Sequence, residues 1–81
     1  MADWILFGTD ACHLCEQAEL MLQEMGLSFD KREVLLDENW LRQYGLRIPV
    51  LFDQVSASEL AWPFSKEDLA EFIMQTSTKT V

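Results

Sequence analysis

Two cysteines in the stretch T-D-A-C-H-L-C-E, residues 9 to 16, constrain this chain more than any other feature. Cys12 and Cys15 are the only cysteines, and His13 between them is the only histidine. A short apolar run precedes them and a helical pattern follows. A C-x-x-C pair at such a strand-to-helix turn places one sulfur at the helix start and the other one turn further in. This spacing predicts a reversible disulfide, with Cys12 accessible and Cys15 shielded.

The composition limits where such a pair can work. The chain has 81 residues, 49% of them hydrophobic, which fits one domain over residues 1–81 with a modest core. The N-terminus lacks a basic start and an apolar core of signal-peptide length, so we expect cytoplasmic residence. In a reducing compartment, a close cysteine pair is more often redox-active or metal-binding than structural.

The charge and hydropathy of the chain exclude several classes of partner. Six basic against fourteen acidic residues give a net charge of −8, which repels phosphate-rich partners, so we expect no nucleic acid. No apolar run approaches the roughly 20 residues of a membrane-spanning helix, so we expect no membrane partner. The acidic surface favours solubility, and a partner with a basic face is the alternative.

The apolar and polar residues predict an α/β chain in the order β-α-β-α-β-β-α. The continuous apolar run Trp4–Phe7 suits a strand buried on both faces. Ser65 and Asp68 form a capping-box pattern, with Phe64 and Leu69 placed as a hydrophobic staple. The predicted strands are 4–7, 29–36, 49–52 and 55–61. The predicted helices are 12–25, with the apolar stripe Leu14, Ala18, Met21, Leu22 and Met25 and a stop at Gly26, a short helix capped by Asp37 that runs through Tyr44, and one starting after Ser65. Residues 76–81 are predicted to fray.

The chain resembles the thioredoxin superfamily over residues 4–75, and among its members the glutaredoxins. The resemblance rests on C-H-L-C after the first strand and I-P-V-L-F at the third. It implies a four-stranded mixed sheet flanked by helices, strand order 2-1-3-4, and a cis Ile48-Pro49 bond. The segment W-P-F, residues 62–64, is similar to that of a small group of bacterial glutaredoxin-like proteins.

The resemblance also implies a function, a thiol-disulfide oxidoreductase. Cys12 would attack a disulfide and Cys15 would resolve the product, while Ile48 and Pro49 offer backbone groups to the substrate. Trp62 would lie at the substrate rim, where glutaredoxins usually carry a Gly-Gly pair. The implied substrates are protein or low-molecular-weight disulfides, with a reductase or glutathione as electron donor. No tightly bound cofactor is implied, and glutathione is the candidate co-substrate.

Two charged residues are candidates for tuning the site. A helix start favours negative charge, so we expect the pKa of Cys12 to lie below the usual thiol value of about 8.5. His13, if protonated and close to the sulfur, would assist; the alternative is an exposed histidine. Arg47 would approach the sulfurs or an anionic substrate tail; the alternative is a solvated loop charge.

Two aromatic residues also have two interpretations. Trp62 and Phe64 form a docking rim or, alternatively, pack against the last helix.

Two further functions fit the same residues. Cys12, His13 and Cys15 are all soft or borderline metal ligands, so metal or iron-sulfur binding is one alternative. A closed zinc site needs four ligands, and the chain has no other cysteine or histidine, so we predict no metal ligands. The other alternative is a non-catalytic interaction module of the same fold, suggested by the W-P-F segment in place of the glycine pair.

Overall fold

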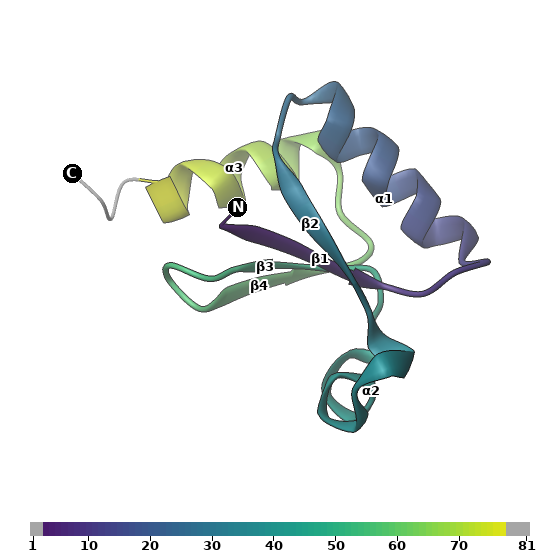
Figure 1. Cartoon of the computed structure of the whole chain (residues 1–81). Helices are drawn as coiled ribbons and strands as arrows, with labels where there is room; N and C mark the ends of the chain where they lie inside the picture. Colours follow the sequence, from purple (N-terminus) through teal and green to yellow (C-terminus); the bar gives the residue numbers. More distant parts are fainter. Residues whose placement is uncertain (1–2, 78–81) are drawn as a thin grey trace.

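The computed structural model describes residues 3–77 and has the predicted order of elements (Figure 1). The strands are β1 (Trp4–Gly8), β2 (Phe29–Glu33), β3 (Val50–Asp53) and β4 (Ser58–Ala61); the helices are α1 (His13–Glu24), α2 (Glu38–Tyr44) and α3 (Lys66–Ser77), with a short 3₁₀ helix η1 (Val34–Leu36) after β2. The fold is therefore α/β with a four-stranded sheet, as predicted.

The sheet is mixed, in the order β2-β1-β3-β4. β1 pairs in parallel with β2 and antiparallel with β3, and β4 pairs antiparallel with β3. Helices α1 and α3 cover one face of the sheet and α2 lies on the other (Figure 1). The implied strand order and the cis Ile48-Pro49 bond are both confirmed. A second cis bond, Trp62-Pro63, was not predicted.

Each face of the sheet carries its own apolar cluster. Because side chains alternate along a strand, Leu6 of β1 points to one face while Ile5 and Phe7 point to the other. The first cluster contains Leu6, Ala18, Leu22, Leu51, Phe64, Leu69 and Phe72, and the second contains Ile5, Phe7, Val34, Tyr44 and Val50. This confirms that the first strand is buried on both faces.

The predicted caps are present. Asp37 accepts hydrogen bonds from the backbone amides of Asn39 and Trp40 at the start of α2. Ser65 and Asp68 bond each other's backbone amides at 3.0 and 2.9 Å, which is the reciprocal capping box. Gly26 has φ +73°, the left-handed conformation that ends a helix.

Several predicted boundaries were wrong. Strand 29–36 ends at Glu33, because Glu33 pairs with the last residue of β1 and no partner continues the ladder. Leu35 and Leu36, beyond that point, are 65% and 80% exposed. The strand predicted at 49–52 is shifted by one residue, and α1 spans 13–24 rather than 12–25, because Cys12 is its N-cap. Leu14 is exposed rather than inward, since it lies about 100° around the helix from buried Cys15.

The turn between β3 and β4 is longer than predicted, so β4 begins at Ser58 instead of residue 55. The buried carboxylate of Asp53 accepts hydrogen bonds from the amides of Val55 and Ser56 and from the Ser56 hydroxyl. A side chain that satisfies three donors in this way competes with the strand ladder for the backbone. The hairpin is therefore organised by one aspartate.

At the C-terminal end, α3 continues through Ser77, so residues 76 and 77 are helical where fraying was predicted; the rest of that predicted tail, 78–81, lies outside the described residues. Within residues 3–77, no helix has both the length and the apolar character needed to cross a bilayer.

Candidate functional site

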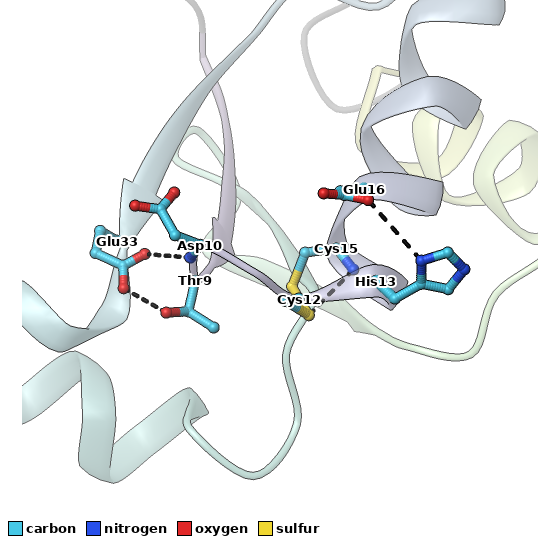
Figure 2. Close-up of a disulfide and its surroundings, with 7 residues drawn as sticks. All are labelled: Thr9, Asp10, Cys12, His13, Cys15, Glu16 and Glu33. Atoms are coloured by element: carbon cyan, nitrogen blue, oxygen red, sulfur yellow. Dashed lines mark hydrogen bonds and ion pairs between the residues drawn. A yellow bond between two sulfur atoms is a disulfide. The ribbon is translucent and has the colours of Figure 1, made fainter.

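The two cysteines meet where β1 gives way to α1. Cys12 and Cys15 are joined by a disulfide, with their Cα atoms 5.2 Å apart (Figure 2). Cys12 is half-buried, whereas Cys15 is only 4% exposed. The structure therefore brings the predicted pair together, with the accessible and shielded sulfurs in the predicted order.

Cys12 is also the N-cap residue of α1. Its Sγ accepts a hydrogen bond from the Cys15 amide at 3.2 Å, and its carbonyl accepts one from the Glu16 amide at 3.1 Å. The first amides of a helix have no partner within the helix and carry partial positive charge. They are placed to stabilise a thiolate on Cys12 when the disulfide is reduced, although the lowered thiol pKa stays a prediction.

Gly8, the last residue of β1, makes room for the buried sulfur. A Cβ atom added at Gly8 would lie 3.0 Å from Cys15 Sγ and 3.3 Å from Cys15 Cβ, which is tighter than ordinary van der Waals contact. The missing side chain therefore allows α1 to bring Cys15 against the end of the strand.

The cis-proline lies at the same end of the sheet as the cysteines. Phe7 pairs with Val50 across antiparallel β1 and β3, so Pro49, which precedes Val50, lies beside the end of β1 where the cysteine loop begins. Pro49 is buried, and its carbonyl accepts a hydrogen bond from the Trp62 amide at 3.0 Å. Ile48 is half-buried against the second apolar cluster.

The Trp62 side chain is held by packing against other apolar residues. Its ring meets that of Phe64 edge to face, with centroids 5.0 Å apart, and it packs against the first apolar cluster. Phe64 is buried in that cluster, together with Leu69, as the staple predicted. Trp62 itself is half-buried, and its bond to Pro49 connects it to the proline loop.

His13 lies on the outside of α1. Its side chain is 83% exposed, and its Nδ1 lies 3.9 Å from a carboxylate oxygen of Glu16. Figure 2 shows the ring directed away from the disulfide. The structure therefore places His13 as an exposed residue, the alternative to the tuning role.

Arg47 is engaged away from the cysteines. Its guanidinium donates to the Gln43 carbonyl at 3.0 Å and to Glu59 at 3.2 Å, and lies 5.3 Å from the centre of the Tyr44 ring. These contacts connect the end of α2 to β4. Arg47 thus links two elements and is not a free charge in solvent, and its partners are Gln43, Glu59 and Tyr44.

Comparison of the sequence with models of known protein families shows which family has this arrangement. The model of the glutaredoxin-like domain (DUF836) matches residues 4–74, nearly the whole chain. The chain belongs to the glutaredoxin-like family. The matched region contains the cysteine pair, the cis-proline and the W-P-F segment.

Solved structures with the same fold also resemble this chain. The crystal structure of target protein XcR50 from X. campestris has TM-score 0.81 and 36% identity, covering 89% of this chain and 96% of that one. Its solution structure has TM-score 0.79 and 37% identity, with coverage of 93% and 95%. Protein Ne2328 from Nitrosomonas europaea, at 23% identity, TM-score 0.76 and coverage of 86% and 88%, shares the fold. Among curated proteins, none matches this glutaredoxin-like chain.

Sequence reasoning missed one part of the site, the contact between the edge strand and the cysteine loop. Glu33, interpreted only as an edge-strand charge, accepts hydrogen bonds from the Thr9 hydroxyl and the Asp10 amide (Figure 2). A cavity of about 320 Å³ opens beside this contact and reaches Cys15; it is lined by Leu6, Gly8, Thr9, Asp10, Ala11, Cys15, Glu16, Glu19, Lys31, Arg32, Glu33 and Leu36. Only the register of β1 against β2 could have shown that Glu33 contacts Thr9 and Asp10.

The geometry around the cysteines bears on the alternative of metal binding. Over residues 3–77, no cluster of three or more histidine, cysteine, aspartate or glutamate side chains is arranged to hold a metal ion. Both sulfurs are bonded to each other.

The ionisation of Tyr44 is expected to make the stability of the glutaredoxin-like domain depend on pH in the alkaline range. Burial raises the pKa of the Tyr44 hydroxyl above its usual value of 10.0, and a hydrogen bond to Glu59 raises it further, while Arg47 opposes both effects. A raised folded-state pKa contributes stability that is fully present below about pH 10 and is lost as pH rises through the folded value. We expect the free energy of unfolding to fall above about pH 10.

Urea unfolding from about pH 8 to about pH 11 checks this, with Tyr44→Phe as the comparison. Tyr44 is the only tyrosine, so phenolate absorbance reports its ionisation directly. The phenylalanine variant should show a shallower alkaline decline because it has no phenol to ionise. Equal declines in the two proteins would contradict the expectation.

Proposed function

We propose that this glutaredoxin-like protein is a thiol-disulfide oxidoreductase that works through Cys12 and Cys15. The observation that carries the proposal is the bonded pair at the start of α1, with Cys12 half-exposed and Cys15 only 4% exposed. A pair in this arrangement can cycle between dithiol and disulfide without rearranging the fold. The shielded sulfur is out of reach of bulky substrates but within bonding distance of its partner.

The reaction consists of two exchanges. In the first, the Cys12 thiolate attacks one sulfur of a substrate disulfide, forms a mixed disulfide, and releases the other substrate sulfur as a thiolate. In the second, Cys15, having lost its proton, attacks Cys12 Sγ and displaces the remaining substrate thiolate. The substrate gains two electrons and two protons overall, and the protein ends as the disulfide seen in the structure.

The substrate would lie across the proline loop. Ile48 and Pro49 come directly before β3, beside the cysteine loop, and the Trp62 amide donates a hydrogen bond to the Pro49 carbonyl. We propose that these residues receive the chain next to a protein or low-molecular-weight disulfide. No tightly bound cofactor is needed for the exchanges. We place the reaction in the cytoplasm, where a reductase or glutathione would return two electrons to the pair.

An electron-donor assay tests the proposal. The oxidised protein is supplied with glutathione and glutathione reductase, or with thioredoxin reductase, each with NADPH, and the reduction of a glutathionylated peptide and of insulin is followed. We expect catalysed reduction with at least one donor. The reduction potential of the pair is measured in parallel. If dithiothreitol opens the disulfide and the reduced protein still exchanges with neither substrate, the proposal is wrong.

A further inference from the structure

The loop that carries Cys12 is short and contains a turn at Asp10 and Ala11. It joins Gly8, at the end of β1, to His13, at the start of α1. Ala11 in this loop has φ 60°, a left-handed conformation that residues with a side chain seldom adopt. In this conformation of the loop, Cys12 is the N-cap of α1. Such a conformation costs free energy and persists where surrounding contacts stabilise it.

Glu33 supplies such contacts from the neighbouring strand. It is the last residue of β2 and pairs with Gly8 in the parallel register, so it stands where the loop leaves the sheet. One carboxylate oxygen accepts the Thr9 hydroxyl, and the other accepts the Asp10 amide at 3.1 Å. An ionised carboxylate offers two acceptor oxygens and no donor, which matches two donors side by side.

The Glu33 carboxylate makes its hydrogen bonds to the loop and not to the neighbouring basic residues. Among residues 3–77 it makes no ion pair, although two basic residues precede it. Lys31 pairs with Glu19 at 3.2 Å, and Arg32 donates to the Lys31 carbonyl at 3.1 Å. A negative charge in this region disfavours a second one on Cys12. Glu33 therefore does not promote the thiolate by its charge, and any benefit must come through position.

We propose that Glu33 is a positioning residue of the redox site, which holds residues 9–11 so that Cys12 caps α1. This inference rests on the proposed function and names a residue that supports it from the edge strand. Glu33 acts through Thr9 and Asp10 and is not itself expected to touch the substrate. Losing its two bonds would let Cys12 drift from the amides at the helix start.

Two neutral replacements of Glu33 separate position from charge. Glu33→Gln keeps an acceptor for the Asp10 amide and a donor for the Thr9 oxygen, whereas Glu33→Ala keeps neither. Both remove the same charge, so the loss of charge cannot cause a difference between them. We expect Cys12 in the alanine variant to be alkylated about fivefold more slowly at neutral pH than in the glutamine variant, with a higher thiol pKa.

Further variants keep the test decisive. Thr9→Val removes one of the two bonds and should show part of the defect, while Thr9→Ser should behave as the parent. Adding Thr9→Val to Glu33→Ala should cause little additional loss, because both act through one contact. Glu38→Ala, at an exposed site in the first turn of α2, removes a carboxylate from another element and should leave the alkylation rate and thiol pKa of Cys12 unchanged. If Glu33→Ala does not fold, the comparison of valine with serine at Thr9 replaces it.

The alkylation rate and thiol pKa of Cys12 are measured on the reduced proteins, and disulfide reduction is assayed separately. Equal alkylation rates and equal pKa values for the alanine and glutamine variants would overturn the inference. If the parent protein reduces no disulfide, the proposed function fails, and the alkylation comparison still decides whether Glu33 positions the cysteine. A slow alanine variant, a glutamine variant at least as fast as the parent and an unchanged Glu38→Ala would support it.

Discussion

Cys12→Ser is expected to reduce the rate of disulfide reduction by at least about 100-fold, because a serine hydroxyl is a far weaker nucleophile than a thiolate. Cys15→Ser is expected to behave differently. It retains the attacking sulfur but not the one that resolves the product, so the mixed disulfide with substrate should accumulate. Mass spectrometry after mixing with a glutathionylated peptide distinguishes the two, since only the Cys15→Ser protein should carry a stable adduct.

The reduced parent protein is the control for both variants, because neither serine protein can form the internal disulfide. Thermal unfolding in excess reductant should give similar midpoints for all three proteins if the cysteines serve chemistry rather than folding. A Cys12→Ser protein that reduces substrate as fast as the parent would refute the assignment of Cys12 as nucleophile. An adduct on Cys12→Ser but not on Cys15→Ser would reverse the two roles.

Features set by residues close together in the chain were predictable. The spacing of Cys12 and Cys15 at the strand-to-helix turn indicated a bonded pair, and the structure has one. The reciprocal bonds of Ser65 and Asp68 follow a local pattern of donors and acceptors. The strand order and the cis bond before Pro49 came from the family resemblance and are confirmed.

Contacts that depend on strand register were not predictable. Glu33 meets the cysteine loop because parallel pairing sets it opposite Gly8, 25 positions earlier by residue number. A shift of one residue would have turned its side chain to the other face. Arg47 likewise reaches from the segment between α2 and β3 to Glu59 of β4, so its position near the cis-proline gave no indication of its partner. The exposure of Leu14 was missed because the periodicity of apolar residues predicts a buried helix face but does not show which residues lie at its centre and which at its edge.

Gly8→Val is expected to make the disulfide easier to reduce. The structure shows the oxidised pair, in which a Cβ at residue 8 would press on Cys15 Sγ at 3.0 Å. In the reduced protein the free thiol of Cys15 can rotate away, so the crowding falls mainly on the disulfide. Overpacking of this kind costs about 2 kcal/mol, which would raise the two-electron reduction potential by about 40 mV. Equilibration with defined ratios of oxidised and reduced glutathione or dithiothreitol measures the shift.

A second glycine provides the control that separates crowding from general loss of stability. Gly26 has φ +73° and nothing within 4 Å of an added Cβ, so Gly26→Ala should cost about 1 kcal/mol of folding stability through backbone strain alone. Because this cost is the same with the pair open or closed, its reduction potential should equal that of the parent. Gly8→Ala should fall between the parent and Gly8→Val, since alanine adds the crowding Cβ without the two methyl groups. An unchanged potential in Gly8→Val would mean that the closed pair does not depend on the space that Gly8 leaves for Cys15.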